Sequence, residues 1–136
     1  MSIEENKNIV RRYQEAYNDN DLEALGEVVA VDVLMPKIMP GVPLGLEGAK
    51  AVHKIMLGGF PDFHTQIDEL IAEDDKVVAR ITMTGTNTGI FMGIPATGNR
   101  VEFTGIYIVR IKNGRIIEHW GEEDGVSLMH QLGVMP

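Results

Sequence analysis

Cysteine is absent from the sequence, so disulfide bonds and thiolate chemistry are excluded. No apolar run approaches the ~18 residues that a membrane-spanning helix needs. The acidic start from Met1 to Glu5 is unlike the basic start of a signal peptide. We therefore expect no signal peptide and no membrane partner, and we take the cytoplasm as the default location.

Basic residues are also scarce, because 12 Lys and Arg face 20 Asp and Glu, which gives a formal net charge of −8. Nucleic acids and anionic membranes bind to basic surfaces, where protein cations replace the counterions of the polyanion. The charge balance therefore argues against a nucleic acid partner. An apolar or neutral small molecule, or another protein, remains possible.

Motifs for metal and nucleophile chemistry are missing as well. The four histidines show neither H-x-H nor H-x-x-x-H spacing, so we expect no metal site. Ser2 and Ser127 are the only serines, and G-x-S-x-G does not occur. The run G-I-P-A-T-G at 93–98 has the glycine spacing of a phosphate-binding loop. A phosphate-binding loop continues with Lys, then Ser or Thr, and then opens a helix. Here Asn99, Arg100 and a predicted strand follow, so we reject a phosphate-binding loop.

The N-terminal part of the chain predicts two helices and a short strand. S-I-E-E at 2–5 forms a capping box, and apolar residues at helical spacing extend the first helix to about Tyr17. N-D-L-E at 20–23 forms a second capping box for a shorter helix. A strand from about Val31 to Met35 should follow.

Residues 36–48 are rich in proline and glycine, with apolar residues between them, and predict a loop. Two interpretations of this loop stay open: a lid that covers a pocket, and an ordinary packed loop. A third helix, from about Glu47 to Leu57, should follow and end at Gly58-Gly59.

The second half of the chain has the period-two alternation of strands. Asn113-Gly114 between two such runs predicts a hairpin, because both turn residues need φ > 0. Helices followed by long strands predict an α+β fold, with helices on one face of a curved, mostly antiparallel sheet, in a single domain spanning 1–136. The expected elements are strands at 63–72 and about 77–84, a turn at 74–75, a Gly-rich connection at 88–98 and a short helix near 126–132.

The last strand ends in Trp120 and a run of acids, and we interpret it as one wall of a pocket. With strict period two, Ile116, Trp120 and Asp124 share one face of this strand, while His119 and Gly121 share the other. An acid beside a Trp in an apolar concavity has a raised pKa, which suits an acid/base catalyst near neutral pH. Asp124 also precedes a predicted helix, where an Asp is a good N-cap. Both roles for Asp124 stay open.

A set of motifs along nearly the whole chain points to a family. They are Y-N-D-N-D-L at 17–22, P-D-F at 61–63, T-G-T-N-T-G at 84–89, G-I-P-A-T-G at 93–98, N-G-R-I-I-E-H-W at 113–120, Asp124, and Q-L-G at 131–133. Together they resemble the SnoaL-like polyketide cyclases, also called ester cyclases, within the nuclear-transport-factor-two-like superfamily.

This resemblance implies a cone-shaped α+β barrel, in which a strongly curved sheet wraps around three helices and encloses a pocket. It also implies a cyclase that closes a polyketide ring by intramolecular aldol condensation, or a related isomerase, without cofactor or metal. Asp124 matches the acid/base of the family. It would remove a proton from a carbon between carbonyl groups, and hydrogen-bond donors would stabilise the resulting enolate.

The resemblance further indicates which residues bind the substrate. Two positions where many relatives carry His are not His here, so we expect an apolar pocket rich in Met. The candidates for substrate binding are Trp120, Tyr107, Tyr17, Asn18, His64, Met35 and Met56.

Two functions of other classes stay open for the same residues: a non-catalytic binding protein for an apolar small molecule, and a dimerisation module with a vestigial pocket. The superfamily resemblance also implies a homodimer through the open face of the sheet, where apolar residues would otherwise form an exposed patch. A single β-bulge would exchange the two faces of the last strands.

Overall fold

The computed structural model describes residues 2–36 and 39–135, which form helices and a five-stranded sheet with the strand order β1-β5-β4-β3-β2. β1 runs parallel to β5, and every other neighbouring pair is antiparallel. The elements are α1 (Ile3–Asn18), α2 (Leu22–Val28), β1 (Val29–Leu34), α3 (Gly45–Gly59), β2 (His64–Glu73), β3 (Lys76–Thr86), β4 (Arg100–Lys112), β5 (Arg115–Glu123) and α4 (Gly125–Gln131).

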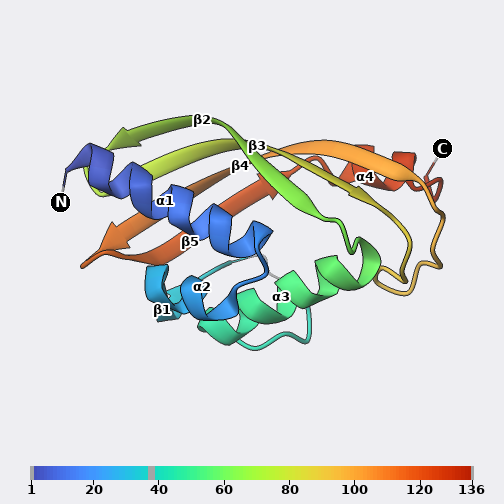
Figure 1. The fold of residues 1–136 in the computed structure, drawn as a ribbon, viewed down its shortest axis with the longest axis horizontal. Coiled ribbons are helices and arrows are strands. Elements are labelled where there is room, and N and C mark those ends of the chain that lie inside the picture. Colours follow the sequence, from blue (N-terminus) through green and yellow to red (C-terminus); the bar gives the residue numbers. More distant parts are fainter. Residues whose placement is uncertain (1, 37–38, 136) are drawn as a thin grey trace.

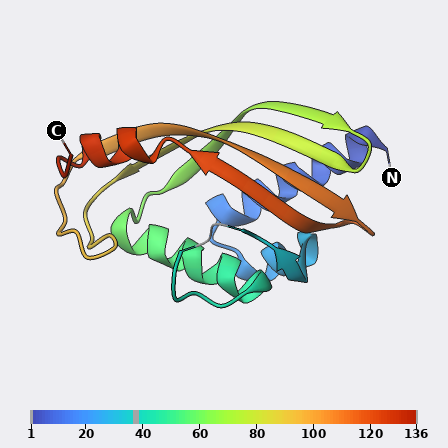
Figure 2. The same cartoon turned by 180° about the vertical axis from the view of Figure 1, so that it is seen from behind.

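The predicted α+β architecture is confirmed. The strands form one curved sheet along the length of the molecule, and α1, α2 and α3 lie on the same side of it (Figure 1). Seen from behind, α4 lies at the end of the sheet away from the N-terminus (Figure 2). We call the face of the sheet that α1, α2 and α3 cover the concave face. We call the opposite face, which these helices do not cover, the open face.

Local capping explains where the first two helices begin. At α1 the capping box is confirmed, because Glu5 N–H donates to Ser2 Oγ at 3.1 Å and Ser2 N–H donates to Glu5 Oε1 at 3.3 Å. The second predicted capping box is wrong. Asp21 is the N-cap of α2 and accepts from Ala24 N–H at 3.1 Å, while Asn20 takes a φ of 56° in the turn after α1.

The end of the predicted 36–48 loop is helical, because α3 already begins at Gly45. Gly45 has a φ of 71°, and a Cβ at this position would overlap the backbone oxygen of Val31, so only glycine lets α3 start this close to β1. Residues 37–38 of the loop lie outside the described residues. The lid interpretation stays a prediction.

Alternation along β3 and β4 builds the core. Inward side chains such as Val77, Ala79 and Val109 are completely buried, while their neighbours on the strand face outward. The hairpin turn between β4 and β5 is confirmed, because Asn113 and Gly114 have φ values of 52° and 75°.

A β-bulge just after this turn decides which side chains of β5 face inward. Ile111 pairs with Ile116 but Arg110 pairs with Glu118, so Ile117 is the extra residue. Beyond the bulge, inward residues of β4 pair with His119, Gly121 and Glu123, whereas outward residues pair with Glu118, Trp120 and Glu122. The prediction that Ile116 shares a face with Trp120 is therefore wrong.

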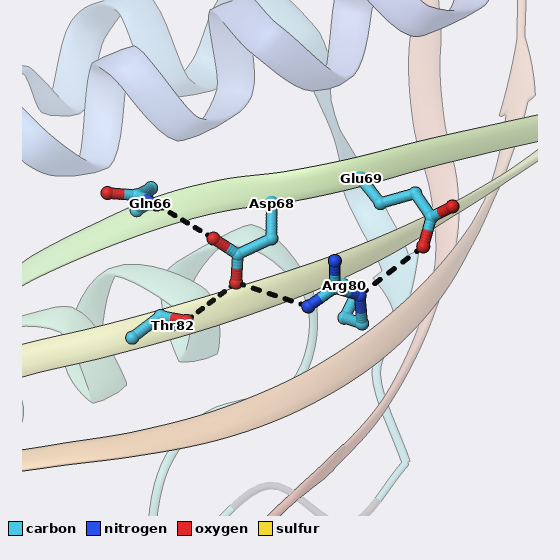
Figure 3. A network of polar contacts seen from close by, with 5 residues as sticks. All are labelled: Gln66, Asp68, Glu69, Arg80 and Thr82. Carbon is cyan, nitrogen blue, oxygen red and sulfur yellow. Dashed lines mark hydrogen bonds and ion pairs between the residues drawn. The ribbon is translucent and has the colours of Figure 1, made fainter.

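A second bulge lies in β2, where Asp68 is the extra residue between Ile67 and Glu69. Its carboxylate accepts from Thr82 Oγ1 at 2.6 Å and from Gln66 Nε2 at 2.8 Å, and it lies 3.8 Å from Arg80 Nη1 (Figure 3). The hydrogen bond from Thr82, followed by that from Gln66, lowers the pKa of Asp68. These contacts fix the bulge on the open face and so help to set the curvature of the sheet.

The connection between β3 and β4 is organised by a completely buried side chain, Asn87. Its Nδ2 donates to Gly59 O at 3.1 Å and to Gly89 O at 3.0 Å. Its Oδ1 accepts from Thr97 N–H at 2.8 Å and from Thr97 Oγ1 at 2.9 Å. One amide thus ties the Gly-rich connection to the end of α3, as the buried polar groups of such a loop require.

Candidate active site

The concave face carries a stack of two polar rings at its centre. Tyr107 on β4 and His119 on β5 have ring centroids 4.8 Å apart and an interplanar angle of 23°. The register explains this contact, because His119 pairs with Val109 and Gly121 pairs with Tyr107, all on the inward side. Gly121 has no side chain, and a Cβ there would lie 3.3 Å from Cε1 of His119. The glycine therefore leaves room for the imidazole to lie toward Tyr107.

α1 contributes three more side chains to this cluster at helical spacing. Tyr13 lies edge-on to both Tyr17, at 5.0 Å, and Tyr107, at 5.9 Å between centroids. Gln14 is buried, and its Oε1 accepts from the hydroxyl of Tyr107 at 3.1 Å. The buried phenol of Tyr107 is thus oriented by a hydrogen bond to the facing helix.

α3 closes the cluster on its other side. The imidazole of His53 lies edge-on to Tyr17, with centroids 4.7 Å apart. The His53 Nε2 atom lies 3.0 Å from Asn20 Oδ1, and the hydroxyl of Tyr17 donates to Ala49 O at 3.3 Å. Side chains from α1, α3, β4 and β5 therefore meet at one place under the sheet.

Burial keeps all of these groups uncharged near neutral pH. Desolvation raises the pKa of Tyr17 to about 12, and it raises the pKa of Tyr107 further. Desolvation, with smaller contributions from Tyr17 and Tyr107, raises the pKa of Tyr13 well above its usual value. Burial lowers the pKa of His119 to about 4 and also lowers that of His53. The cluster therefore consists of uncharged phenols and imidazoles.

The structure brings only some of the predicted substrate-binding residues to this cluster. Tyr107 and Tyr17 belong to it, and Met35 and Met56 are partly buried side chains that pack against the core. His64 is exposed at the start of β2.

Asn18 has a structural partner. Its Nδ2 donates to Thr65 O at 2.8 Å, and its Oδ1 accepts from Thr65 N–H at 2.9 Å. Both ends of the amide are thus occupied by the backbone of β2, which joins the C-terminus of α1 to the sheet.

Trp120 does not lie with Tyr107, contrary to the predicted pocket wall. It pairs with Ile108 on the open face, its side chain is 46% exposed, and its Nε1 donates to Glu118 Oε1 at 3.1 Å. The bulge at Ile117 is the physical reason. One extra residue reverses the alternation of the β5 side chains after it, so Trp120 points away from the helices.

Asp124 takes the capping role that the sequence left open. It is the N-cap of α4, and its Oδ1 accepts from Ser127 N–H at 2.9 Å. The residue is exposed and lies beside open-face residues at the end of β5. Its acid/base role stays a prediction.

Sequence reasoning missed three residues of this cluster: Tyr13, Gln14 and His119. Tyr13 has the helical spacing of an ordinary apolar position in the first helix, and a strict period of two places His119 on the face away from the expected pocket. Knowing that the β-bulge lies at Ile117 would have corrected the face of His119, because the bulge decides which residues of β5 pair with Tyr107 and Gly105.

Within residues 2–36 and 39–135, no three His, Cys, Asp or Glu side chains gather closely enough to hold a metal ion. None of the helices in the described part of the chain is long and apolar enough to span a membrane.

Comparisons with known proteins agree with this architecture. The family model of the SnoaL-like polyketide cyclases matches residues 7–132. Aklanonic acid methyl ester cyclase DnrD of Streptomyces peucetius is 30% identical over 128 residues, which cover 92% of this chain and 88% of the relative. TsrD from Streptomyces laurentii superposes with a TM-score of 0.90 at 31% identity over 99% of each chain. IdmH from Streptomyces antibioticus superposes with a TM-score of 0.83 at 33% identity over 95% of this chain and 99% of the other. The chain is thus a member of the SnoaL-like polyketide cyclase family.

Proposed function

We propose that this protein is a cyclase that closes a ring by acid/base chemistry on a neutral, largely apolar polyketide, without cofactor or metal. The observation that carries the proposal is the neutral phenol and imidazole cluster on the concave face, in a chain similar to aklanonic acid methyl ester cyclases. An ester of that kind is the first substrate to test. The net charge of −8 also favours a neutral ligand over a polyanion.

The proposed reaction is an intramolecular aldol addition. A carboxylate takes a proton from a carbon between two carbonyl groups, and the enolate carbon then attacks a ketone carbon of the same molecule. The new alkoxide takes the proton back from the carboxylic acid, so substrate and product are isomers. Such a reaction needs a base and hydrogen-bond donors for the oxygens that gain charge.

Tyr17 and His119 are the best candidates to contact the substrate. Both side chains keep accessible surface even though desolvation shifts their pKa values. Side chains that are accessible and yet desolvated support a cavity beside Tyr17 and His119, as a substrate pocket requires. The hydroxyl of Tyr17 donates to Ala49 O over a long 3.3 Å, so a substrate oxygen could compete for this donor.

The test is turnover of aklanonic acid methyl ester, with product and substrate separated by chromatography and identified by their equal mass. We expect turnover by the wild type and a loss of about 10²-fold in kcat for Tyr17→Phe, as for other lost oxyanion donors. Trp120→Phe on the open face is the matched control and should keep its kcat. Binding without turnover would favour the binding-protein alternative, and an unchanged Tyr17→Phe variant would contradict the role of this cluster.

A homodimer through the open face also belongs to the proposal. One apolar residue from each of four strands lines up across this face: Ile71, Val78, Ile108 and Trp120. Ile71, Ile108 and Trp120 are 57%, 41% and 46% exposed. Rows that contain Glu, Arg and Lys flank the apolar row on both sides. An apolar centre with a charged rim is typical of protein interfaces.

Light scattering coupled to size-exclusion chromatography tests the dimer. The wild type should elute with twice the monomer mass, and Trp120→Glu should elute as a monomer, because it places a charge in the apolar row. Arg115→Glu changes an exposed charge at the other end of β5 and should leave the mass unchanged. A monomeric wild type would contradict this part of the proposal.

A further inference from the structure

Gln14 is a polar residue on the buried side of α1. The residue is 7% exposed, and Val10, one helical turn before it, is completely buried. The Oε1 atom of Gln14 accepts from the hydroxyl of Tyr107 at 3.1 Å, so its amide bridges from the helix to β4. Gln14 therefore lies on the concave face, in direct contact with the phenol and imidazole cluster.

The two ends of this amide have different surroundings. A glutamine amide carries one acceptor oxygen and an NH2 group with two donors. Within residues 2–36 and 39–135, the Gln14 side chain makes a single hydrogen bond, through Oε1, and its Nε2 has no partner. The inaccessible side-chain polar atoms without a partner in these residues are Asn6 Oδ1 and Arg110 Nε. The Nε2 atom of Gln14 is not one of them, so it keeps accessible surface inside a residue that is more than nine-tenths buried.

Tyr107 fixes the orientation of the Gln14 amide. Burial raises the pKa of Tyr107, so its hydroxyl keeps the proton that it donates to Oε1. The Tyr107 ring is itself held by its stack on His119, with centroids 4.8 Å apart. Because the amide is planar, an oxygen held in this way gives the NH2 group a defined direction. Donors that are oriented in advance need little reorganisation when charge develops beside them.

The hydroxyl donors around Gln14 are engaged within the protein. Tyr107 donates to Gln14, and Tyr17 donates to Ala49 O at 3.3 Å. Tyr17 follows Gln14 by three residues on α1, so both side chains leave the helix on the same side, with Cβ atoms roughly 5–6 Å apart. The NH2 group of Gln14 is therefore an uncommitted donor beside the tyrosine that we expect to contact the substrate.

We propose that the NH2 group of Gln14 donates a hydrogen bond to the enolate oxygen that forms during ring closure. This inference rests on the proposed function and adds a catalytic residue to its site. When the base removes the C–H proton, the electron pair of that bond moves toward the carbonyl, and its oxygen gains the negative charge. The enolate carbon then forms the C–C bond, and the alkoxide takes the proton back. A donor at the enolate oxygen binds the charged state more strongly than the neutral ketone, so Gln14 should act on kcat more than on KM.

Gln14→Met tests the donor in the turnover assay with aklanonic acid methyl ester. Methionine has a similar length but no N–H group, and we expect kcat to fall about 10²-fold with KM changed by less than about threefold. The matched control is Gln66→Met, the same substitution at an exposed residue of β2, which should keep its kcat. An unchanged kcat of Gln14→Met would overturn the inference.

Tyr107→Phe separates the donor from a purely structural role of Gln14. This variant breaks the same buried hydrogen bond from the other side but keeps the NH2 group of Gln14. Destabilisation would therefore affect both variants, whereas loss of the donor affects only Gln14→Met. We expect the loss of kcat in Tyr107→Phe to be at least about tenfold smaller than in Gln14→Met. Equal losses in the two variants would overturn the inference.

A second readout distinguishes this inference from the proposed function. If the wild type does not convert the ester, the proposed function fails for this substrate, and nitrogen NMR spectra of the side-chain amides with the same ester test Gln14. The Gln14 signal is assigned by its absence in Gln14→Met. A shift of this signal on addition of the ester, in the wild type and in Tyr107→Phe, with the Gln66 signal unmoved, supports a donor that faces the ligand. An unmoved Gln14 signal would overturn the inference.

Discussion

The hydrogen bond between Tyr107 and Gln14 should be a measurable link between the sheet and α1. The Tyr107 hydroxyl donates to Gln14 Oε1 at 3.1 Å, and both side chains are buried. Tyr107→Phe keeps the ring and its stacking on His119 but leaves the Gln14 oxygen without this donor. A buried acceptor without a partner costs about 1–3 kcal/mol in the free energy of unfolding. For a domain of this size, each kcal/mol lowers the melting temperature by roughly 3–5 °C.

A double-mutant cycle isolates this interaction from other effects of each substitution. Gln14→Leu alone removes the acceptor and leaves the Tyr107 hydroxyl buried, so it should destabilise as well. Together, Tyr107→Phe and Gln14→Leu remove both partners, and the double variant should be more stable than the two single effects predict, by about 1 kcal/mol or more. Urea unfolding followed by circular dichroism gives these values. Additive single effects would refute the structural role of this bond.

Three further predictions concern the stability of the folded protein. Asn87→Ala removes the four hydrogen bonds of a buried side chain and should cost about 4 kcal/mol at about 1 kcal/mol each in urea unfolding; a loss below about 1 kcal/mol would contradict the proposed anchor. Gly45→Ala should destabilise by at least about 1–2 kcal/mol, since alanine must adopt a left-handed φ and overlap Val31; an unchanged melting temperature would contradict this packing. The pKa of His119 is lowered from 6.5 to about 4 in the folded protein. As the pH drops, the unfolded chain therefore binds a proton at this residue before the folded protein does. The free energy of unfolding should fall between about pH 6.5 and pH 4. His119→Gln should flatten that slope, leaving the same-sign contribution of His53, and an unchanged slope would argue against a neutral, desolvated His119.

Local signals in the sequence predicted much of the fold correctly. The capping box at 2–5 and the Asn113-Gly114 turn depend on neighbouring residues only, and both are present. The family motifs also indicated the curved sheet around three helices. The second capping box was wrong because Asp21 and Asn20 are both good cap residues, and the turn after α1 selects Asp21.

The candidate site depends on contacts that no local pattern specifies. The bulge at Ile117 exchanges the faces of β5, so a strict period of two grouped Ile116 with Trp120 and separated His119 from the pocket. Tyr13 has the spacing of an ordinary core residue, and only the packing of α1 against the sheet brings it to Tyr107. Asn87 anchors a loop through partners far along the chain, which its sequence neighbours do not reveal.

We propose that the concave face holds the site of a cofactor-independent ring closure. The most direct measurement is the conversion of aklanonic acid methyl ester by the purified wild type and by variants of the two faces. We expect an isomeric product from the wild type, a large loss of kcat for Tyr17→Phe and little change of kcat for Trp120→Phe. No isomer from any variant, or equal rates when either face is changed, would contradict it.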